Sequence, residues 1–304
     1  MRGGLQSLHV RIRSIAENHA YQLKQCLTLT QSSKIIDTED AMHQEILTPV
    51  DGDASGNRSA QGTALSRSAV TLGIVCPMAN EGEAATRFSQ AVLEQCSGFK
   101  KVTFFAVFDR ANKDSSLDRM REMERVEPRL QVVWAPENRC VVDAYLRGYK
   151  EALDAGSDWI LEIDAGFSHQ PGDIPQFFDA MEKGLDCVFG SRFIGRFEKS
   201  SHARRFVSWG GTLLTNLLLG TRQTDMTSGF ELFSREALLM VMGRGIQSRA
   251  HFFQTEIKTH CRNLRIVEVP ITYRSASPRL GSSSIKEAFK QLWRLFQLRL
   301  KEQL

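Results

Sequence analysis

The chain has 304 residues, of which 42% are hydrophobic and 24% are charged, a balance that suits a globular protein with a substantial core. Its formal net charge of +4 is too small to indicate a nucleic-acid partner without a local basic patch. No uninterrupted run of about 18 apolar residues occurs, so no transmembrane helix is expected. The six cysteines lack metal-ligand spacing, which favours free thiols in a reducing compartment and hence a cytoplasmic location.

Composition divides the chain into three parts. Residues 1–68 are polar, and within them residues 51–67 are rich in Gly, Ser, Ala and Asn. Such a stretch buries too little apolar surface to offset the entropy lost on ordering. We therefore expect a flexible N-terminal extension over residues 1–68, with one short helix near its start, a folded domain over residues 69–284 and an amphipathic helix over residues 285–304.

From residue 69 the sequence alternates between short apolar runs and helix-like segments. The expected strands cover residues 69–77, 101–108, 130–134, 159–164 and 186–190. The expected helices between them cover residues 83–95, 115–125, 141–155 and 174–183. Two more helices, at 205–219 and 251–261, and a last strand at 265–273 follow. This order predicts an α/β fold with a mostly parallel sheet and helices on both faces.

Polar residues follow the expected strands at the edge where a parallel sheet binds its ligands. Asp164 is the strongest candidate, because it ends the apolar run 159–163 and opens a polar turn. A carboxylate at this place can hold a divalent cation against a diphosphate, or it can simply cap the next turn. The residues alone leave these two alternatives open.

The segment around Asp164, ILEIDAGFSHQPGDIPQF at residues 160–177, resembles the metal-binding segment of family 2 glycosyltransferases, above all the polyprenyl-phosphate sugar transferases. The family segment reads Asp-Ala-Asp, then Phe or Leu, Ser or Gln, His and Pro. The chain departs from it at Gly166, which replaces the second acid. The resemblance implies a GT-A type, Rossmann-like fold and a divalent metal, Mg²⁺ or Mn²⁺, at Asp164.

Further segments resemble the same family in the same order, over about residues 70–290. VCPMANEGE at 75–83 resembles the opening Pro-x-x-Asn-Glu segment. VFDRANKDSS at 107–116 resembles the family's acidic segment, with Arg110 in place of its second acid, and residues 140–142 replace the usual Gly-Leu-Gly. The resemblance implies that the nucleotide-sugar donor is bound by Pro77, Asn80, Glu81, Asp109, Asn138 and Asp164.

The later segments imply an acceptor side. GSRF at 190–193, RRFVS at 204–208 and TDMTSGFELFSREAL at 224–238 resemble family segments. The resemblance places Arg192, Arg204 and Ser208 near an acceptor phosphate, which the planar donors of arginine suit. Asp225 either accepts a proton from an acceptor hydroxyl or fixes its own loop.

Gln254 and Arg279 are further candidates for substrate binding, because they lie in segments that resemble the family's Phe-Gln-x-Glu segment and its basic tail. For Gln254, packing on a helix face is as open as a ligand contact. For Arg279, a surface salt bridge is as open as a phosphate contact.

The C-terminal segment is amphipathic. Lysines and arginines stand among its polar positions, and one helical face carries Ile285, Phe289, Leu292, Trp293, Phe296 and Leu300. Such a face either packs on the domain or another subunit, or lies on an anionic membrane surface. Both alternatives remain open at this point.

Together these features predict an inverting transferase that moves a hexose, mannose or glucose, from a nucleoside-diphosphate sugar to a polyprenyl phosphate at the cytoplasmic face of a membrane. One alternative is transfer to a glycan or small-molecule hydroxyl, with Asp225 as general base. The other, supported by the departures at Arg110, residues 140–142 and Gly166, is a non-catalytic protein that binds a nucleotide sugar or a lipid phosphate.

Overall fold

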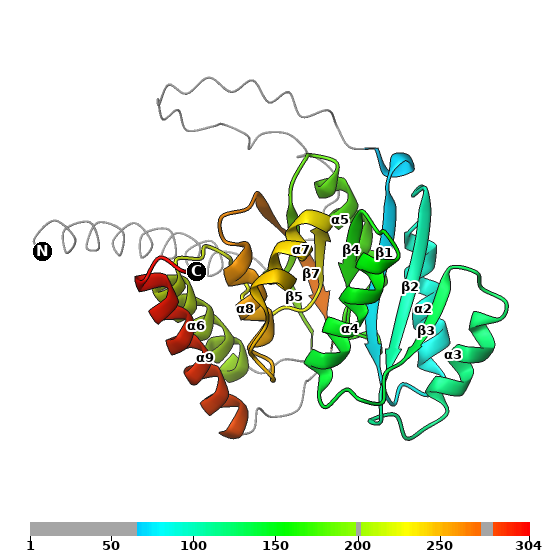
Figure 1. Ribbon diagram of the computed structural model, residues 1–304, viewed down its shortest axis with the longest axis horizontal. Coiled ribbons are helices and arrows are strands. Elements are labelled where there is room, and N and C mark those ends of the chain that lie inside the picture. Colours follow the sequence, from blue (N-terminus) through cyan, green and yellow to red (C-terminus); the bar gives the residue numbers. More distant parts are fainter. Residues whose placement is uncertain (1–65, 199–201, 275–281) are drawn as a thin grey trace, which may run out of the picture. The chain divides into compact units, whose positions relative to one another are not determined.

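The computed structural model describes residues 66–198, 202–274 and 282–304 (Figure 1). The expected N-terminal extension lies almost entirely outside these residues, as does Arg279. Arg204 lies in a described helix, but its side chain is outside the description.

The described strands form one seven-stranded sheet in the order β3-β2-β1-β4-β6-β5-β7. Neighbouring strands are parallel except for β6, which is antiparallel to both β4 and β5. The strands are β1 (Thr71–Met78), β2 (Lys101–Phe108), β3 (Leu130–Trp134), β4 (Trp159–Glu162), β5 (Cys187–Phe197), β6 (Glu231–Ser234) and β7 (Ile266–Tyr273). The expected α/β fold with a mostly parallel sheet is therefore confirmed.

Helices cover both faces of the sheet. Successive strand residues point to opposite sides, so both faces carry apolar side chains that a helix layer must bury. Ile74 and Cys76 pack in a core with α2 (Ala84–Gln95), α3 (Ser116–Glu124) and α5 (Ile174–Met181). Val75 between them packs in a second core with α4 (Val141–Asp154), α7 (Arg235–Arg244) and α8 (Phe253–Cys261). Two short 3₁₀ turns, Arg67–Ala69 and Pro171–Asp173, precede β1 and α5.

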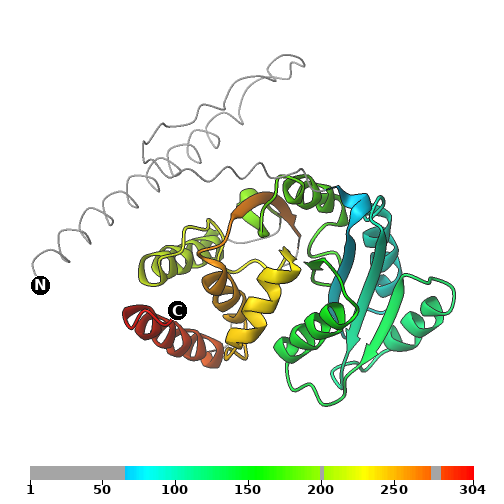
Figure 2. The ribbon, with the colours of Figure 1, turned by 45° about the horizontal axis from the view of Figure 1, so that its top comes forward.

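Two long helices, α6 (His202–Leu219) and α9 (Ser282–Leu300), lie side by side away from the sheet (Figures 1 and 2). They share a small third core around Leu219, Leu292 and Leu295. None of the helices in the described part of the chain is both long enough and apolar enough to cross a membrane.

Three features of the fold were not expected from the sequence. The strand β6 is absent from the expected elements because its four residues, with glutamate and serine at the ends, lack a recognisable apolar run. The helix α7 that follows it is also absent from the expected elements. β5 also continues seven residues past the expected end at 190, to Phe197, and only three of these seven residues are exposed.

Gly148 sets how closely α4 approaches β1 and β2. A β-carbon at this position would lie 2.3 Å from Val75 Cγ1 and 3.1 Å from Val107 Cγ2. Because both valines are fully buried, neither has room to move away. The glycine therefore permits the packing of the helix that carries Tyr145 to the edge of the site.

We expect Gly148→Ala to lower the free energy of unfolding by about 1–3 kcal/mol through overpacking. Chemical denaturation measures this loss. The matched control is Gly211→Ala in α6, where a β-carbon meets nothing within 4 Å and alanine should leave stability unchanged or raise it. Equal effects of the two substitutions would contradict the close approach of α4 to the sheet.

Candidate active site

The loop after β1 is fastened to the loop after β2 by side chains from both. The Asn80 amide donates to Ala111 O (2.9 Å) and accepts from Lys113 N (2.6 Å). The Ser116 hydroxyl accepts from the backbone N–H groups of Glu81 and Gly82, at 2.8 Å each. Asn80, an expected donor-binding residue, thus also determines where the neighbouring Glu81 lies.

Asp164 follows β4 at the same edge of the sheet. One carboxylate oxygen, Oδ1, accepts a hydrogen bond from the Tyr145 hydroxyl of α4. The other, Oδ2, lies 3.7 Å from His169 Nδ1, and the side chain is 43% exposed. The Tyr145 hydroxyl therefore orients the carboxylate, which stays open to a ligand.

His169 is neutral and supports this turn. Its Nδ1 faces the Asp164 N–H at 3.4 Å, and its ring stacks on Phe230 with centroids 5.2 Å apart. Burial lowers the pKa of His169 to about 4, against the smaller opposing effect of the Asp164 charge. The ring therefore carries no charge at neutral pH, in keeping with an orienting role.

The remaining expected donor-binding residues lie on the first three strands or just after them. Pro77 is partly buried in β1, and Asp109 follows β2, where its Oδ1 accepts from Ala111 N at 2.7 Å. Asn138 lies between β3 and α4, and its buried Nδ2 has no partner among the described residues. The parallel topology thus brings all these polar groups to one edge of the sheet.

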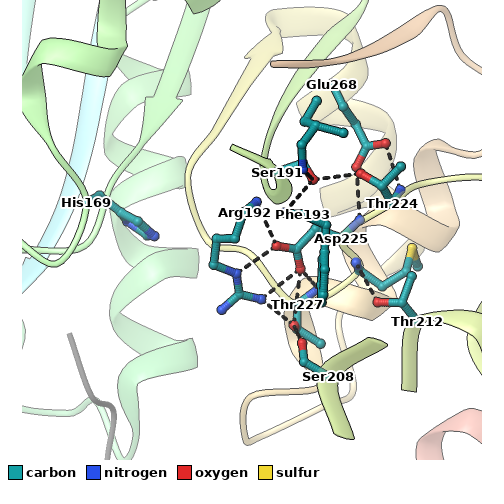
Figure 3. A network of polar contacts seen from close by, with 12 residues as sticks. His169, Ser191, Arg192, Phe193, Ser208, Thr212, Thr224, Asp225, Thr227 and Glu268 are labelled. Carbon is teal, nitrogen blue, oxygen red and sulfur yellow. Dashed lines mark hydrogen bonds and ion pairs between the residues drawn. The ribbon is translucent and has the colours of Figure 1, made fainter. Parts of the chain in front are cut away.

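A second polar network surrounds Arg192 in β5 (Figure 3). Its guanidinium donates to both carboxylate oxygens of Asp225, from Nε at 2.7 Å and from Nη2 at 2.7 Å. Nη2 also donates to Thr227 Oγ1 at 2.6 Å, and Thr227 Oγ1 lies 3.2 Å from the Ser208 hydroxyl of α6. Arg192, Ser208 and Asp225, expected from separate segments, therefore meet in one place.

Asp225 is a buried anion without a free lone pair toward solvent. It is fully buried and also accepts from the backbone N–H groups of Arg192 (3.1 Å) and Thr227 (3.1 Å). Burial alone would raise the pKa of its carboxyl, but the charges of Arg192 and Lys258 outweigh burial and hold the pKa well below its usual range. Such a carboxylate orients Arg192 and is not suited to accept a proton near neutral pH.

Further buried groups fix the backbone around Asp225. Glu268 of β7 accepts from Thr224 N (2.7 Å) and Asp225 N (3.0 Å), and Lys258 of α8 donates to Asp225 O (2.6 Å). Lys258 also pairs with Glu231 of β6 at 3.0 Å, and both side chains are fully buried. The position of Arg192 is thus determined by three elements at once.

Gln254 belongs to a buried layer beneath both networks. It is 4% exposed, and its amide donates to Glu162, which also accepts from the Tyr149 hydroxyl. Glu162 faces Glu231 across the β4–β6 pair, so burial and then the Glu231 charge raise the pKa of the Glu162 carboxyl well above its usual range. The structure therefore places Gln254 in internal packing, away from the exposed edge.

Several residues of these networks were not expected from the sequence, among them Tyr145, Thr227, Lys258 and Glu268. Tyr145 contacts Asp164 from 19 positions away, and Lys258 contacts Asp225 from 33. Nothing in the local pattern distinguishes them from ordinary helix or strand residues. Thr227 could have been predicted, because it lies two residues after Asp225 in a segment that resembles the family.

Residues 73–239 match the family described as Glycosyl transferase family 2. The chain belongs to this family. Among its curated relatives is an undecaprenyl-phosphate mannosyltransferase from Micrococcus luteus, 31% identical over 183 residues, which are 59% of this chain and 74% of the relative. A polyprenol monophosphomannose synthase from Mycolicibacterium smegmatis is 27% identical over 190 residues, 60% of this chain and 72% of the relative.

Solved structures agree on the fold. Glucosyl-3-phosphoglycerate synthase from Mycobacterium tuberculosis in complex with UDP matches with a TM-score of 0.55 at 13% identity, covering 80% of this chain and 86% of that one. The same enzyme with Mn²⁺, UDP-glucose and phosphoglyceric acid matches with a TM-score of 0.54 at 15% identity, covering 75% and 80%. The family match over residues 73–239 confirms the resemblance to family 2 glycosyltransferases, and these structures agree with its fold.

The Arg192–Asp225 ion pair should make the free energy of unfolding depend on pH in the acid range. Because the folded pKa of Asp225 lies below its unfolded value of about 3.9, the pair's contribution is present above pH 4 and is lost as pH falls through the folded pKa. Asp225→Asn leaves Arg192 buried without its anion, so we expect a loss of about 3–5 kcal/mol at pH 7 and a shallower fall of stability toward pH 3.

Urea denaturation of both proteins between pH 3 and pH 7 measures this difference. Asp118→Asn, at an exposed position of α3, is the control and should keep the wild-type pH dependence. An Asp225→Asn protein whose stability stays parallel to that of the wild type across this range would contradict the assignment of Asp225 as a buried anion.

Proposed function

We propose that this chain transfers a hexose from a nucleoside-diphosphate sugar to a polyprenyl phosphate, with inversion at the sugar carbon. The observation that carries the proposal is that Asp225 is a buried anion in an ion pair with Arg192. Transfer to a hydroxyl requires a general base, and a carboxylate held in this ion pair is not suited to accept a proton. A phosphate acceptor is ionised near neutral pH and needs no such base. The names of the two curated relatives, a polyprenyl-phosphate mannosyltransferase and a polyprenol monophosphomannose synthase, support this acceptor class.

Arg192 is the residue proposed to hold the acceptor phosphate. Its Nε and Nη2 bind Asp225, whereas none of the described hydrogen bonds uses Nη1. The ion pair thus orients the guanidinium and leaves one side of its fork for a phosphate oxygen. Ser208 and Thr227 add hydroxyl groups to the same place, and Arg204 and Arg279 remain candidates for further charge.

The proposed donor side is the edge that carries Asp164. Its partly exposed carboxylate is of the type that Mg²⁺ and Mn²⁺ prefer, and no group of three or more His, Cys, Asp or Glu side chains in the described residues forms a complete metal site. A divalent ion bound there would offset the charge of the leaving diphosphate. Asp164 would hold that ion, while Tyr145 orients its carboxylate and His169 accepts from its backbone N–H.

A transfer assay with polyprenyl phosphate tests the role of Arg192. Arg192→Ala should lower kcat/KM for the acceptor by roughly ten- to a hundredfold, the loss of one charge-assisted phosphate contact. Donor affinity should stay nearly unchanged. Because the alanine variant leaves Asp225 unpaired, Arg192→Lys serves as a second variant that keeps the charge. A collapse of donor affinity with unaltered acceptor dependence would contradict the assignment.

The helices α6 and α9 are proposed to meet the membrane that carries such an acceptor. The structure divides the apolar face of α9: Leu292 and Leu295 are buried against neighbouring residues, whereas Phe289 (60%) and Trp293 (59%) are exposed. On α6, Phe206 is 70% exposed. One edge of α9 thus packs on the protein, and the exposed edge is the part proposed to lie on the membrane. Exposed Lys286 and Lys290 add charge of the sign that anionic lipids attract.

Sedimentation with anionic liposomes tests this surface. Trp293→Glu should reduce the bound fraction several-fold, because it removes apolar area and adds a repelled charge, and binding should also fall as salt is raised. Val126→Glu is the control, since Val126 is 82% exposed at the end of α3 and away from both helices. Equal losses in the two variants would show that α9 is not the docking element.

A further inference from the structure

Gly166 stands where the family segment has its second acid, and its surroundings are unusual. Its φ of +79° is in the left-handed region that favours glycine. A β-carbon built on it would lie 2.6 Å from Glu81 Oε2 and 3.6 Å from Glu81 Cδ. A side chain at 166 and the Glu81 carboxylate therefore compete for the same space.

The Glu81 carboxylate is brought there by a rigid loop. The N–H groups of Glu81 and Gly82 both donate to Ser116 Oγ, and Gly82 N also donates to Asp114 Oδ2 at 2.9 Å. The side chain of Asn80, the residue before Glu81, is hydrogen-bonded to the loop after β2. These contacts fix the backbone of the loop from which the Glu81 side chain reaches Gly166.

The charges around Glu81 are of one sign. Burial and then the negative charge of Asp114 raise the pKa of the Glu81 carboxyl, and Asp164 adds to this effect. The geometric observation is that the Glu81 carboxylate lies over Gly166, two residues past Asp164, and that β1 and β4, which these loops follow, are neighbours in the sheet. A divalent cation between the two loops would offset the charge of both carboxylates.

We infer that Glu81 supplies the second carboxylate of the metal and diphosphate site, in the space that an acid at position 166 would otherwise fill. Gly166 is then the residue that makes room for it. The ligand class is a hard divalent cation, Mg²⁺ or Mn²⁺, bound together with a nucleoside diphosphate. With two carboxylates from the chain, the remaining ligands must come from diphosphate oxygens and water. The inference rests on the proposed function, because the donor completes the site.

Mn²⁺ binding, followed by the electron paramagnetic resonance of the free ion, tests this role without relying on turnover. Measurements use the full chain with GDP, with UDP and without nucleotide. With the diphosphate that supports binding, Glu81→Gln and Asp164→Asn should each weaken Mn²⁺ binding by roughly tenfold or more. Glu83→Gln, two residues on and 79% exposed, should bind like the wild type.

A double variant separates this role from a structural one. Gly166→Asp alone should not gain affinity, because the new side chain meets Glu81. Glu81→Ala combined with Gly166→Asp should recover Mn²⁺ affinity that Glu81→Ala loses, since the acid now comes from position 166. Thermal unfolding without metal should be unchanged or raised in Glu81→Gln, because a carboxylate among like charges is removed.

Two results would overturn the inference. Mn²⁺ affinity in Glu81→Gln within twofold of the wild type, with loss in Asp164→Asn, would remove Glu81 from the site and leave the proposed transfer intact. Wild-type sugar transfer in excess chelator would remove the metal itself. Absence of transfer to polyprenyl phosphate under any metal is a different failure, because it contradicts the proposed function.

Discussion

The buried ion pair between Arg192 and Asp225 is the interaction that determines the geometry of the proposed acceptor side. A fully buried carboxylate is costly unless it is paired and hydrogen-bonded, and here two guanidinium N–H groups and two backbone N–H groups satisfy it. Glu268 and Lys258 hold the backbone on which the carboxylate stands. A guanidinium fixed in this way is a pre-organised cation, which loses little conformational entropy when it binds a phosphate.

The proposed donor side has a different requirement. The Glu81 carboxylate lies over Gly166, two residues past Asp164, and the charges that raise the pKa of Glu81 are negative. A cation bound there would offset these charges, whereas the proposed acceptor contact uses the Arg192 guanidinium that Asp225 holds in place. Both proposed substrates are anionic, so each of them requires positive charge at its site.

Much of the fold was predictable because apolar runs of five to eight residues mark buried parallel strands. The expected bounds 101–108 and 130–134 agree with β2 and β3. β6 was missed because its four residues take their burial from β4 and β5, not from their own pattern. The same limit applied at the site. Asp225 was expected with two alternative roles, since only the contact with Arg192, 33 residues away, decides between them. Likewise the departure at Gly166 was visible, whereas the Glu81 carboxylate above it, 85 positions earlier, was not.

In the proposed transfer the acceptor phosphate is already ionised, so that no side chain removes a proton. The decisive measurement is the pH dependence of kcat/KM for polyprenyl phosphate, compared with that for the corresponding alcohol polyprenol. With the phosphate we expect kcat/KM to rise through about pH 6, where a phosphate monoester loses its second proton, and to stay level above it. Polyprenol should give no product. Transfer to polyprenol at a comparable rate, with a pH dependence that Asp225→Asn abolishes, would contradict the account.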